Sequence, residues 1–405
     1  MIPPVDASRN PLTKTHVPEF DGLRGIACLM VLLWHLVRLQ IGHLSGWWGV
    51  VGLALSQAWS GVDLFFVLSG FLIIGSLLDR QHLPHQLQSF ASARVFRLLP
   101  GYAALLAAFA AVRWFYSAHD QSNTIHSLLA GAYPGWVYAC FGQSWVLGLS
   151  PQASGPTYGT PFLAVTWSLC AEMEYYVLAA LVILYAPRNS RAAILVAMVL
   201  GAELFRAVMS TQASQLPLAV SVLPPARMDG FALGALAAFT IRSQTARDAL
   251  RPVILPVWAL LAVGFGFLTT LNSAPFGSFT SNFGYEWIDI FYAATLMLVA
   301  LRSEQRHIRA LGAGPLAWLG TISYSVYLCH QPVHALYTNL LGIPSAYLTL
   351  PEGLMYWLGD ILAVLAVGLA GYLLVERPGI RLGARLRRAW RTDAMSASTF
   401  TAGPS

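Results

Sequence analysis

The chain alternates between long apolar stretches and short polar segments. About ten of the stretches are long enough to cross a bilayer as helices, which takes roughly 20 residues each. They occupy residues 20–39, 56–78, 96–116, 161–185, 192–210, 217–241, 252–271, 286–301, 314–337 and 355–375. This pattern predicts an all-α fold, a polytopic membrane helix bundle of about ten transmembrane helices.

The composition supports a membrane location. Hydrophobic residues make up 56% of the chain and charged residues 10%, with a mean hydropathy of +0.59. Soluble domains carry about 25% charged residues. The net charge of +6 does not indicate nucleic-acid binding, because the basic residues lie in short loops between apolar stretches.

The loop charges predict an orientation. Most of the 24 Lys and Arg residues fall on one side if the N-terminus is cytoplasmic and the Gly-, Trp- and Tyr-rich stretch 125–149 makes no net crossing. We therefore expect both termini in the cytoplasm and 125–149 as a re-entrant or interfacial segment on the outer face. The expected division is a cytoplasmic N-terminal tail at 1–17, a transmembrane domain at 18–380, and a basic, disordered cytoplasmic tail at 381–405.

The four cysteines suggest no metal or redox site. They lie in apolar stretches and form no CxxC pair, which is typical of small side chains that pack between helices. We expect no metal cofactor.

The first apolar stretch contains two ionisable residues. Arg24 lies near its start and His35 lies eleven residues later, which is roughly 16 Å along an α-helix. An ionisable side chain this deep in a bilayer is costly unless it faces protein or water, so the default interpretation is functional.

Two carboxylates are candidates to assist His35. Asp63 lies near the outer end of the second stretch, at a depth similar to that of His35, and Glu172 lies near the middle of the fourth. A carboxylate beside a histidine fixes its tautomer and stabilises its protonated form, which suits a general base. The alternative is that these buried polar groups only specify helix packing.

Three arginines are expected at the inner face. Arg94 and Arg97 share one side of a helix, and Arg24 lies at the same membrane surface. Guanidinium groups bind phosphates through charge-assisted hydrogen bonds, although inner-face arginines are also ordinary topology determinants. A phosphopantetheine arm, roughly 15–20 Å long, would match the Arg24–His35 separation. The arrangement predicts acyl transfer from cytoplasmic acyl-CoA to a hydroxyl that arrives from the outer side.

Other residues are weaker candidates for substrate binding. Arg227 follows Pro224 and Pro225, where a broken helix would expose backbone groups. Asp229, and Glu203 with Arg206, are more typical of intramembrane pairs than of catalytic groups. Aromatic residues of the outer segment either stack on a sugar ring or anchor the protein at the interface, namely Tyr133, Trp136, Tyr138 and Trp145.

Several short motifs occur in a recognisable order. They are Arg24 and His35 with ten residues between them, GVDLFFVLSGFLI at 61–73 with Asp63 and Ser69, Arg94 and Arg97 followed by Pro100, WSLCAEMEYY at 167–176 with Glu172, RMDGFALGAL at 227–236 with Arg227, ISYSVYLCHQPV at 322–333 with His330, and VERP at 375–378. Over about residues 18–380 the chain resembles the membrane-bound acyltransferase-3 family of bacterial O-acyltransferases.

The resemblance implies a multi-pass protein of the bacterial inner membrane that transfers an acyl group, with acetyl expected, from acetyl-CoA or another acyl-CoA to a carbohydrate or lipid-linked saccharide. It implies that Arg24 and His35 are essential and that Asp63, Arg94, Arg97 and Glu172 are functional. We expect Arg227, His330, Trp145 and Ser69 to contact substrate. Many family members also carry a periplasmic hydrolase-like domain, so this chain is expected to be the stand-alone form. Whether a homodimer forms, or a periplasmic partner completes the transfer, stays open.

Two other functions remain open at this point. One is acyl transfer to a small hydroxylated metabolite such as a macrolide sugar. The other is a transporter or flippase of a lipid-linked sugar that uses the buried ionisable groups as a proton relay, although no inverted repeat is found. Whether an acyl-histidine intermediate forms is likewise undecided.

Overall fold

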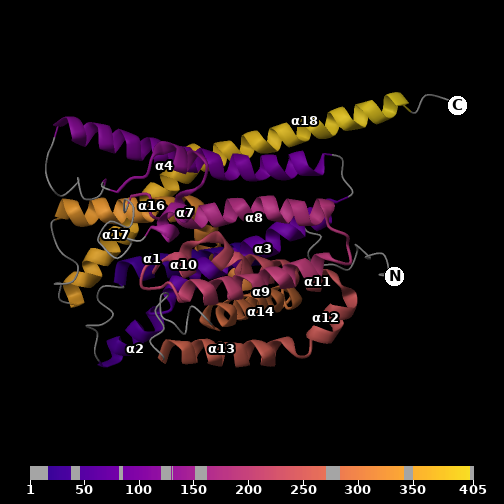
Figure 1. Cartoon of the computed structure of the whole chain (residues 1–405), viewed down its shortest axis with the longest axis horizontal. Coiled ribbons are helices and arrows are strands. Elements are labelled where there is room, and N and C mark those ends of the chain that lie inside the picture. The colour runs from indigo at the N-terminus through magenta and orange to yellow at the C-terminus, as the bar shows by residue number, and fades with distance from the viewer. Residues whose placement is uncertain are drawn as a thin grey trace.

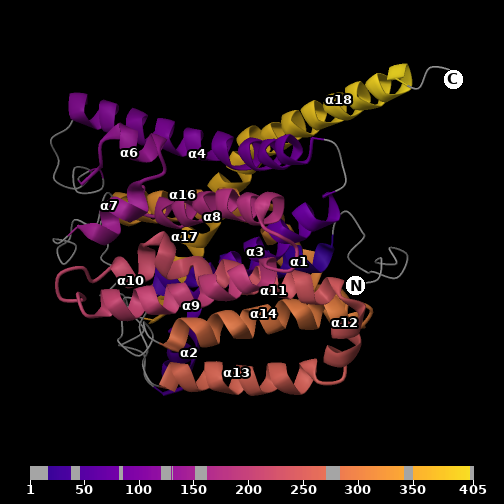
Figure 2. The same cartoon turned by 45° about the vertical axis from the view of Figure 1, so that its right-hand side comes forward.

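The structure, a computed structural model, describes residues 17–37, 46–81, 85–119, 129, 131–150, 162–270, 283–341 and 350–401. This part of the chain consists of helices and connecting turns and contains no strand. The all-α prediction is therefore confirmed. Figures 1 and 2 show most of the long helices running side by side as one bundle.

The longer helices are α1 (Pro18–Val37), α2 (Gly46–Leu55), α3 (Gly61–Asp79), α4 (Gln86–His119), α8 (Thr166–Tyr185), α9 (Arg191–Ser210), α11 (Met228–Arg242), α13 (Ile254–Thr270), α14 (Tyr285–Leu301), α16 (Gly314–Leu341), α17 (Leu350–Gly371) and α18 (Arg377–Thr401). Short helices connect them: η4 (Ala58–Ser60), α6 (Gly135–Ala139), α7 (Gln143–Leu149), α10 (Ala219–Val222), η5 (Pro224–Arg227), α12 (Gln244–Leu250), α15 (Arg306–Leu311) and η8 (Tyr372–Glu376).

Several helices are apolar enough to span a membrane on their own. The segments are Gly49–Asp79, Gln86–Tyr116, Thr166–Tyr185, Arg191–Ser210 and Met355–Trp390, and the pair Gln244–Leu250 and Ile254–Leu268, bent by 66°, adds a sixth. The chain is thus a multi-pass helical membrane protein. The prediction of ten crossings with both termini inside remains a prediction.

The centre of the bundle is built on two close helix pairs, α1 with α16 and α3 with α11. Glycines make both crossings tight. A Cβ atom on Gly25 would clash with the backbone carbonyl of Leu316 in α16, and a Cβ on Gly234 in α11 would clash with that of Val67 in α3. Small residues allow helix backbones to approach closely in a membrane, where packing drives association. These crossings hold α1 closely against α16, and α3 closely against α11.

The stretch predicted to lie at the outer face contains α6 and α7, of five and seven residues. A helix needs roughly 20 residues to cross the bilayer, so neither spans it alone. Residues 120–128 and 130 lie outside the described residues. At the other end of the chain, α18 is a helix from Arg377 to Thr401, which differs from the disordered tail expected from residue 381.

Candidate active site

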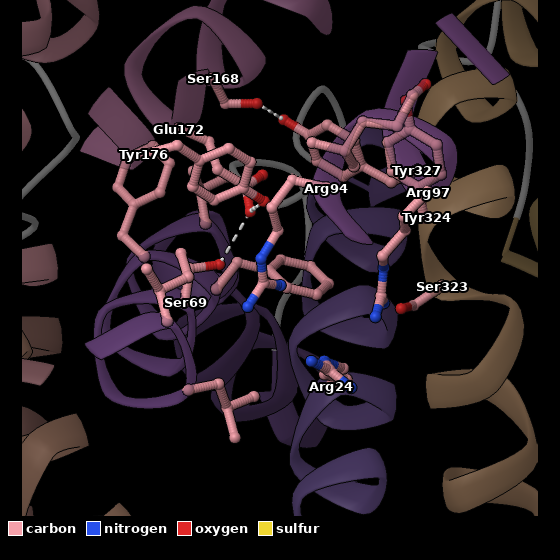
Figure 3. Close-up of a pocket in the computed structure, with 16 residues that line it drawn as sticks. Arg24, Ser69, Arg94, Arg97, Ser168, Glu172, Tyr176, Ser323, Tyr324 and Tyr327 are labelled. Carbon is pink, nitrogen blue, oxygen red and sulfur yellow. Dashed lines mark hydrogen bonds between the residues drawn. The ribbon is translucent and has the colours of Figure 1, made fainter. Parts of the chain in front are cut away.

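A cavity lies between five helices, α1, α3, α4, α8 and α16 (Figure 3). Its empty space, the open mouth included, is about 720 Å³. Six of its sixteen lining residues are apolar and ten are polar or charged. The polar lining residues are Arg24, Ser69, Arg94, Arg97, Ser168, Glu172, Tyr176, Ser323, Tyr324 and Tyr327.

The three arginines expected at the inner face all line this cavity. Arg24 donates a hydrogen bond to Asp21, 3.0 Å away on the same helix. Arg94 lies over the rings of Phe90 and Tyr176, and its Nε is buried without a hydrogen-bond partner among the described residues. The cavity is therefore strongly cationic and suited to an anionic ligand.

Arg94 and Arg97 are placed by the opening turns of α4, on the same side of the helix. The side chain of Arg97 has no hydrogen-bond partner among the residues that the structure describes. Figure 3 shows the guanidinium groups of Arg24, Arg94 and Arg97 gathered in one part of the cavity. Their mutual repulsion favours an anion between them.

Glu172 is the carboxylate of the cavity. Its Oε1 accepts hydrogen bonds from the Ser69 hydroxyl at 3.1 Å and from the Tyr176 hydroxyl at 2.6 Å. The Ser69 contact joins α3 to α8, and the Tyr176 contact lies within α8. These two hydroxyls are the hydrogen-bond partners of Glu172 among the described residues, and its predicted role in orienting His35 stays a prediction.

Ser168 and Tyr327 close the other end of the cavity. Their hydroxyls lie 2.6 Å apart and join α8 to α16 (Figure 3). The Tyr327 ring lies 5.4 Å from the ring of His330, which is 2% exposed. His330 in turn packs edge-on against His35, with ring centroids 4.8 Å apart. His35 therefore does not line the cavity, and it is connected to the lining residue Tyr327 by ring contacts through His330.

The hydrogen bonds of His35 define its tautomer. Nδ1 lies 2.9 Å from the Val31 carbonyl, which only accepts, so Nδ1 carries the proton. Nε2 then holds a lone pair, which accepts a hydrogen bond from the side-chain amide of Gln331 at 2.8 Å. His330 repeats the arrangement: Nδ1 donates to the Tyr327 carbonyl at 2.6 Å. Its Nε2 is buried without a hydrogen-bond partner among the described residues.

Asp63 is not placed against His35 as the sequence suggested. Its carboxylate forms a buried ion pair with Arg227, and both side chains are almost completely inaccessible. Arg227 also lies over the Tyr285 ring, 3.8 Å from its centroid. Since Arg227 is buried in this pair and outside the cavity, its predicted contact with substrate has no support in the geometry.

The match to known proteins covers nearly the whole chain. The family model described as an acyltransferase domain matches residues 17–376. The chain belongs to this acyltransferase family. No solved structure matches it.

Three relatives of this acyltransferase come from bacteria. BcsY of Komagataeibacter xylinus, assigned as a membrane-bound transacylase, is 29% identical over 371 residues that cover 91% of this chain and 84% of BcsY. The peptidoglycan O-acetyltransferase OatA of Listeria monocytogenes is 26% identical over 345 residues, which cover 82% of this chain and 51% of that protein. OatA of Staphylococcus aureus, an O-acetyltransferase, is 23% identical over 380 residues that cover 90% of this chain and 57% of that protein. The chain thus spans most of BcsY and about half of the O-acetyltransferases.

A second ionic cluster of the acyltransferase lies away from the cavity, between α9, α11 and α14. Arg206, fully buried, pairs with Asp229 at 2.8 Å, with Glu203 at 3.1 Å and with Glu286. The sequence predicted the pairing of Glu203 with Arg206 and a pairing role for Asp229, without naming Arg206 as its partner. Carboxylates around a buried arginine compensate its charge and fix helix packing.

Trp145 lies on α7 at 37% exposure, where its indole N–H donates to Glu174 of α8 at 2.7 Å. Tyr133 stacks on Tyr138, whose hydroxyl accepts a hydrogen bond from the Tyr133 backbone N–H at 3.3 Å. Trp136 is 66% exposed. Whether these aromatic residues contact a sugar stays a prediction.

Sequence reasoning missed two features of α16. Gln331 lies in the motif around His330 and its residue type alone indicates no role, yet its side-chain amide donates a hydrogen bond to Nε2 of His35. His334, one turn further along α16, donates through Nδ1 to Asp360 of α17 at 2.5 Å. The i to i+4 spacing of His330 and His334 was the available signal. Among the described residues, no group of three or more His, Cys, Asp or Glu side chains could hold a metal ion.

Proposed function

We propose that the protein is an O-acyltransferase that moves an acyl group, with acetyl expected, from cytoplasmic acyl-CoA to a hydroxyl of a cell-surface glycan or lipid-linked saccharide. The observation that carries the proposal is that one helix bears both residues: Arg24 of α1 lines the cationic cavity, and His35 of α1 packs against His330. The two positions are eleven residues apart, roughly 16 Å along α1.

The donor end is the arginine cavity. Coenzyme A carries phosphates at one end and its thioester at the end of a long arm. Arg24, Arg94 and Arg97 would hold the phosphates by charge-assisted hydrogen bonds. Ser69 and Tyr176 keep the Glu172 carboxylate occupied, which limits its repulsion of the donor phosphates.

The reactive end is the histidine pair. In the proposed step, Nε2 of His35 takes the proton of the acceptor hydroxyl while the oxygen attacks the thioester carbonyl. The C–S bond breaks, an ester forms, and the proton passes from the imidazolium to the departing CoA thiolate. For this to happen, the Gln331 amide must yield its hydrogen bond to the acceptor hydroxyl.

The class of acceptor is taken from the relatives. Two of them are named O-acetyltransferases, one of them acting on peptidoglycan, so a carbohydrate hydroxyl is the first acceptor to try. A small hydroxylated metabolite is the alternative acceptor within the same chemistry.

The test uses the purified full chain in nanodiscs with acetyl-CoA. Free thiol release is measured with and without glycan acceptors, for the wild type and for His35→Ala. We expect acceptor-dependent release in the wild type and a loss of about 10²–10⁴-fold in kcat for the variant. Full activity of a correctly folded His35→Ala protein would contradict the base assignment. Transport of a lipid-linked sugar without any thiol release would replace the proposal with the flippase alternative.

A further inference from the structure

The helix α18 lies outside the matched family domain, which ends at residue 376. It nevertheless packs along the first half of α4, the helix that supplies two of the three cavity arginines. Figures 1 and 2 both show α18 beside α4 before it projects beyond the bundle. The contact joins a segment without an assigned role to the donor cavity.

The contact is centred on Phe96, which lies between Arg94 and Arg97 in the chain. Pro100 is inside α4 and has no backbone N–H, so the Phe96 carbonyl four residues earlier loses its usual helical partner. Gly379 of α18 covers this carbonyl so closely that a Cβ atom there would lie 2.7 Å from the oxygen. A Cβ on Gly383 would lie 2.7 Å from the Phe96 Cβ.

The opposite face of α18 is basic. Arg377, Arg381 and Arg385 are spaced four residues apart and are exposed, and a helix of 3.6 residues per turn places them on one side. Gly379 and Gly383 point to the other side, toward α4. None of these three arginines has a hydrogen-bond or ion-pair partner among the described residues, so their charge is not used within the bundle.

We infer that this basic face binds the anionic headgroups of the inner leaflet and that the bound helix holds the turn of α4 from Arg94 to Arg97 in place for the donor. Anionic headgroups are the expected ligand because of the positive charge of these arginines and their position at the end of a membrane-spanning segment. The segment Met355–Trp390 is helical and apolar enough to cross the membrane, so the arginines at its end emerge where lipid phosphates lie. The inference rests on the proposed donor site.

The experiment compares nanodiscs of phosphatidylcholine alone with discs that contain phosphatidylglycerol. In the anionic discs we expect the KM for acetyl-CoA to fall about fivefold, the size of one arginine–lipid contact, with kcat changed less than about twofold. Bulk electrostatics predict the opposite sign, because an anionic surface repels the anionic donor. A fall in KM therefore reports the positioning of the cavity.

Two double variants separate α18 from the general charge of the inner face. Arg381→Gln with Arg385→Gln should give the same KM in both kinds of disc. Arg306→Gln with Arg309→Gln, which removes two exposed arginines of α15, should retain the wild-type dependence on lipid. Loss of the dependence in both variants, or in neither, would overturn the inference.

Hydrogen–deuterium exchange of residues 377–401 gives a readout that needs no activity. We expect slower exchange in anionic discs for the wild type and no difference for the α18 variant. Equal exchange in both discs overturns the inference, as does protection without a change in KM. If no thiol is released in either disc, the proposed function has failed, while the exchange measurement still decides the lipid contact.

Discussion

At the scale of single residues, the hydrogen bond from Gln331 to His35 determines whether the imidazole can act as a base. An amide N–H donates to the Nε2 lone pair and can be displaced by a hydroxyl that does the same. A carboxylate in its place can only accept, so it would hold a proton on Nε2 and remove the lone pair.

The two substitutions at position 331 should therefore differ. We expect Gln331→Ala to lower kcat by less than about tenfold and Gln331→Glu to lower it by about 10²–10⁴-fold, like the loss of the base itself. Steady-state thiol release with saturating acetyl-CoA measures both. Equal effects of the two variants would mean that the lone pair of His35 is not used.

The arginines of the cavity should act on donor affinity. Hydrogen bonds to charged groups contribute about 1.5–3 kcal/mol each, so Arg97→Gln should raise the KM for acetyl-CoA about 10–100-fold with a smaller change in kcat. Arg113→Gln, on the same helix and outside the cavity lining, is the matched control. A variant Arg97→Gln with unchanged donor affinity would remove Arg97 from the phosphate grip.

At the scale of helices, the sequence predicts how deep a residue lies in the membrane but not how each helix is rotated about its own axis. Counting residues along a span predicts that Asp63 and His35 lie at similar depths, yet it does not fix which neighbour each side chain faces. That is set by the glycine crossings, which turn Asp63 toward Arg227 of η5 and His35 toward α16. The level of the three arginines was predictable in the same way, whereas their position around one cavity also depends on how α1 and α4 are rotated.

The buried cluster around Arg206 should stabilise the arrangement of α9, α11 and α14. Removing one partner of a buried charged pair leaves the others uncompensated, at a cost of about 3–5 kcal/mol. We expect Arg206→Leu to lower the thermal unfolding temperature in detergent well below that of Arg242→Gln.

Arg242 is the comparison because its partner Asp79 is 46% exposed and stays solvated when the pair is broken, whereas Arg206 and Asp229 are both fully buried. Equal unfolding temperatures for the two variants would show that the cluster around Arg206 does not stabilise the bundle.

At the scale of the whole molecule, the predicted orientation places Cys140, which is exposed, on the outer side. A membrane-impermeant maleimide added to intact cells should label Cys140, and a Cys140→Ala variant should remove that label. Ser303→Cys, in the loop after α14, should react only after the membrane is permeabilised. Labelling of Ser303→Cys in intact cells would invert the predicted topology.

The helix α1 also acts as a molecular ruler. It is a continuous helix from Pro18 to Val37, and neither Arg24 nor His35 can approach the other without breaking it. If Arg24 helps to hold the donor phosphates and the thioester must reach His35, the enzyme selects its donor by the length of the arm between them. Acetyl thioesters with truncated arms, however reactive in solution, would then fall short of the base.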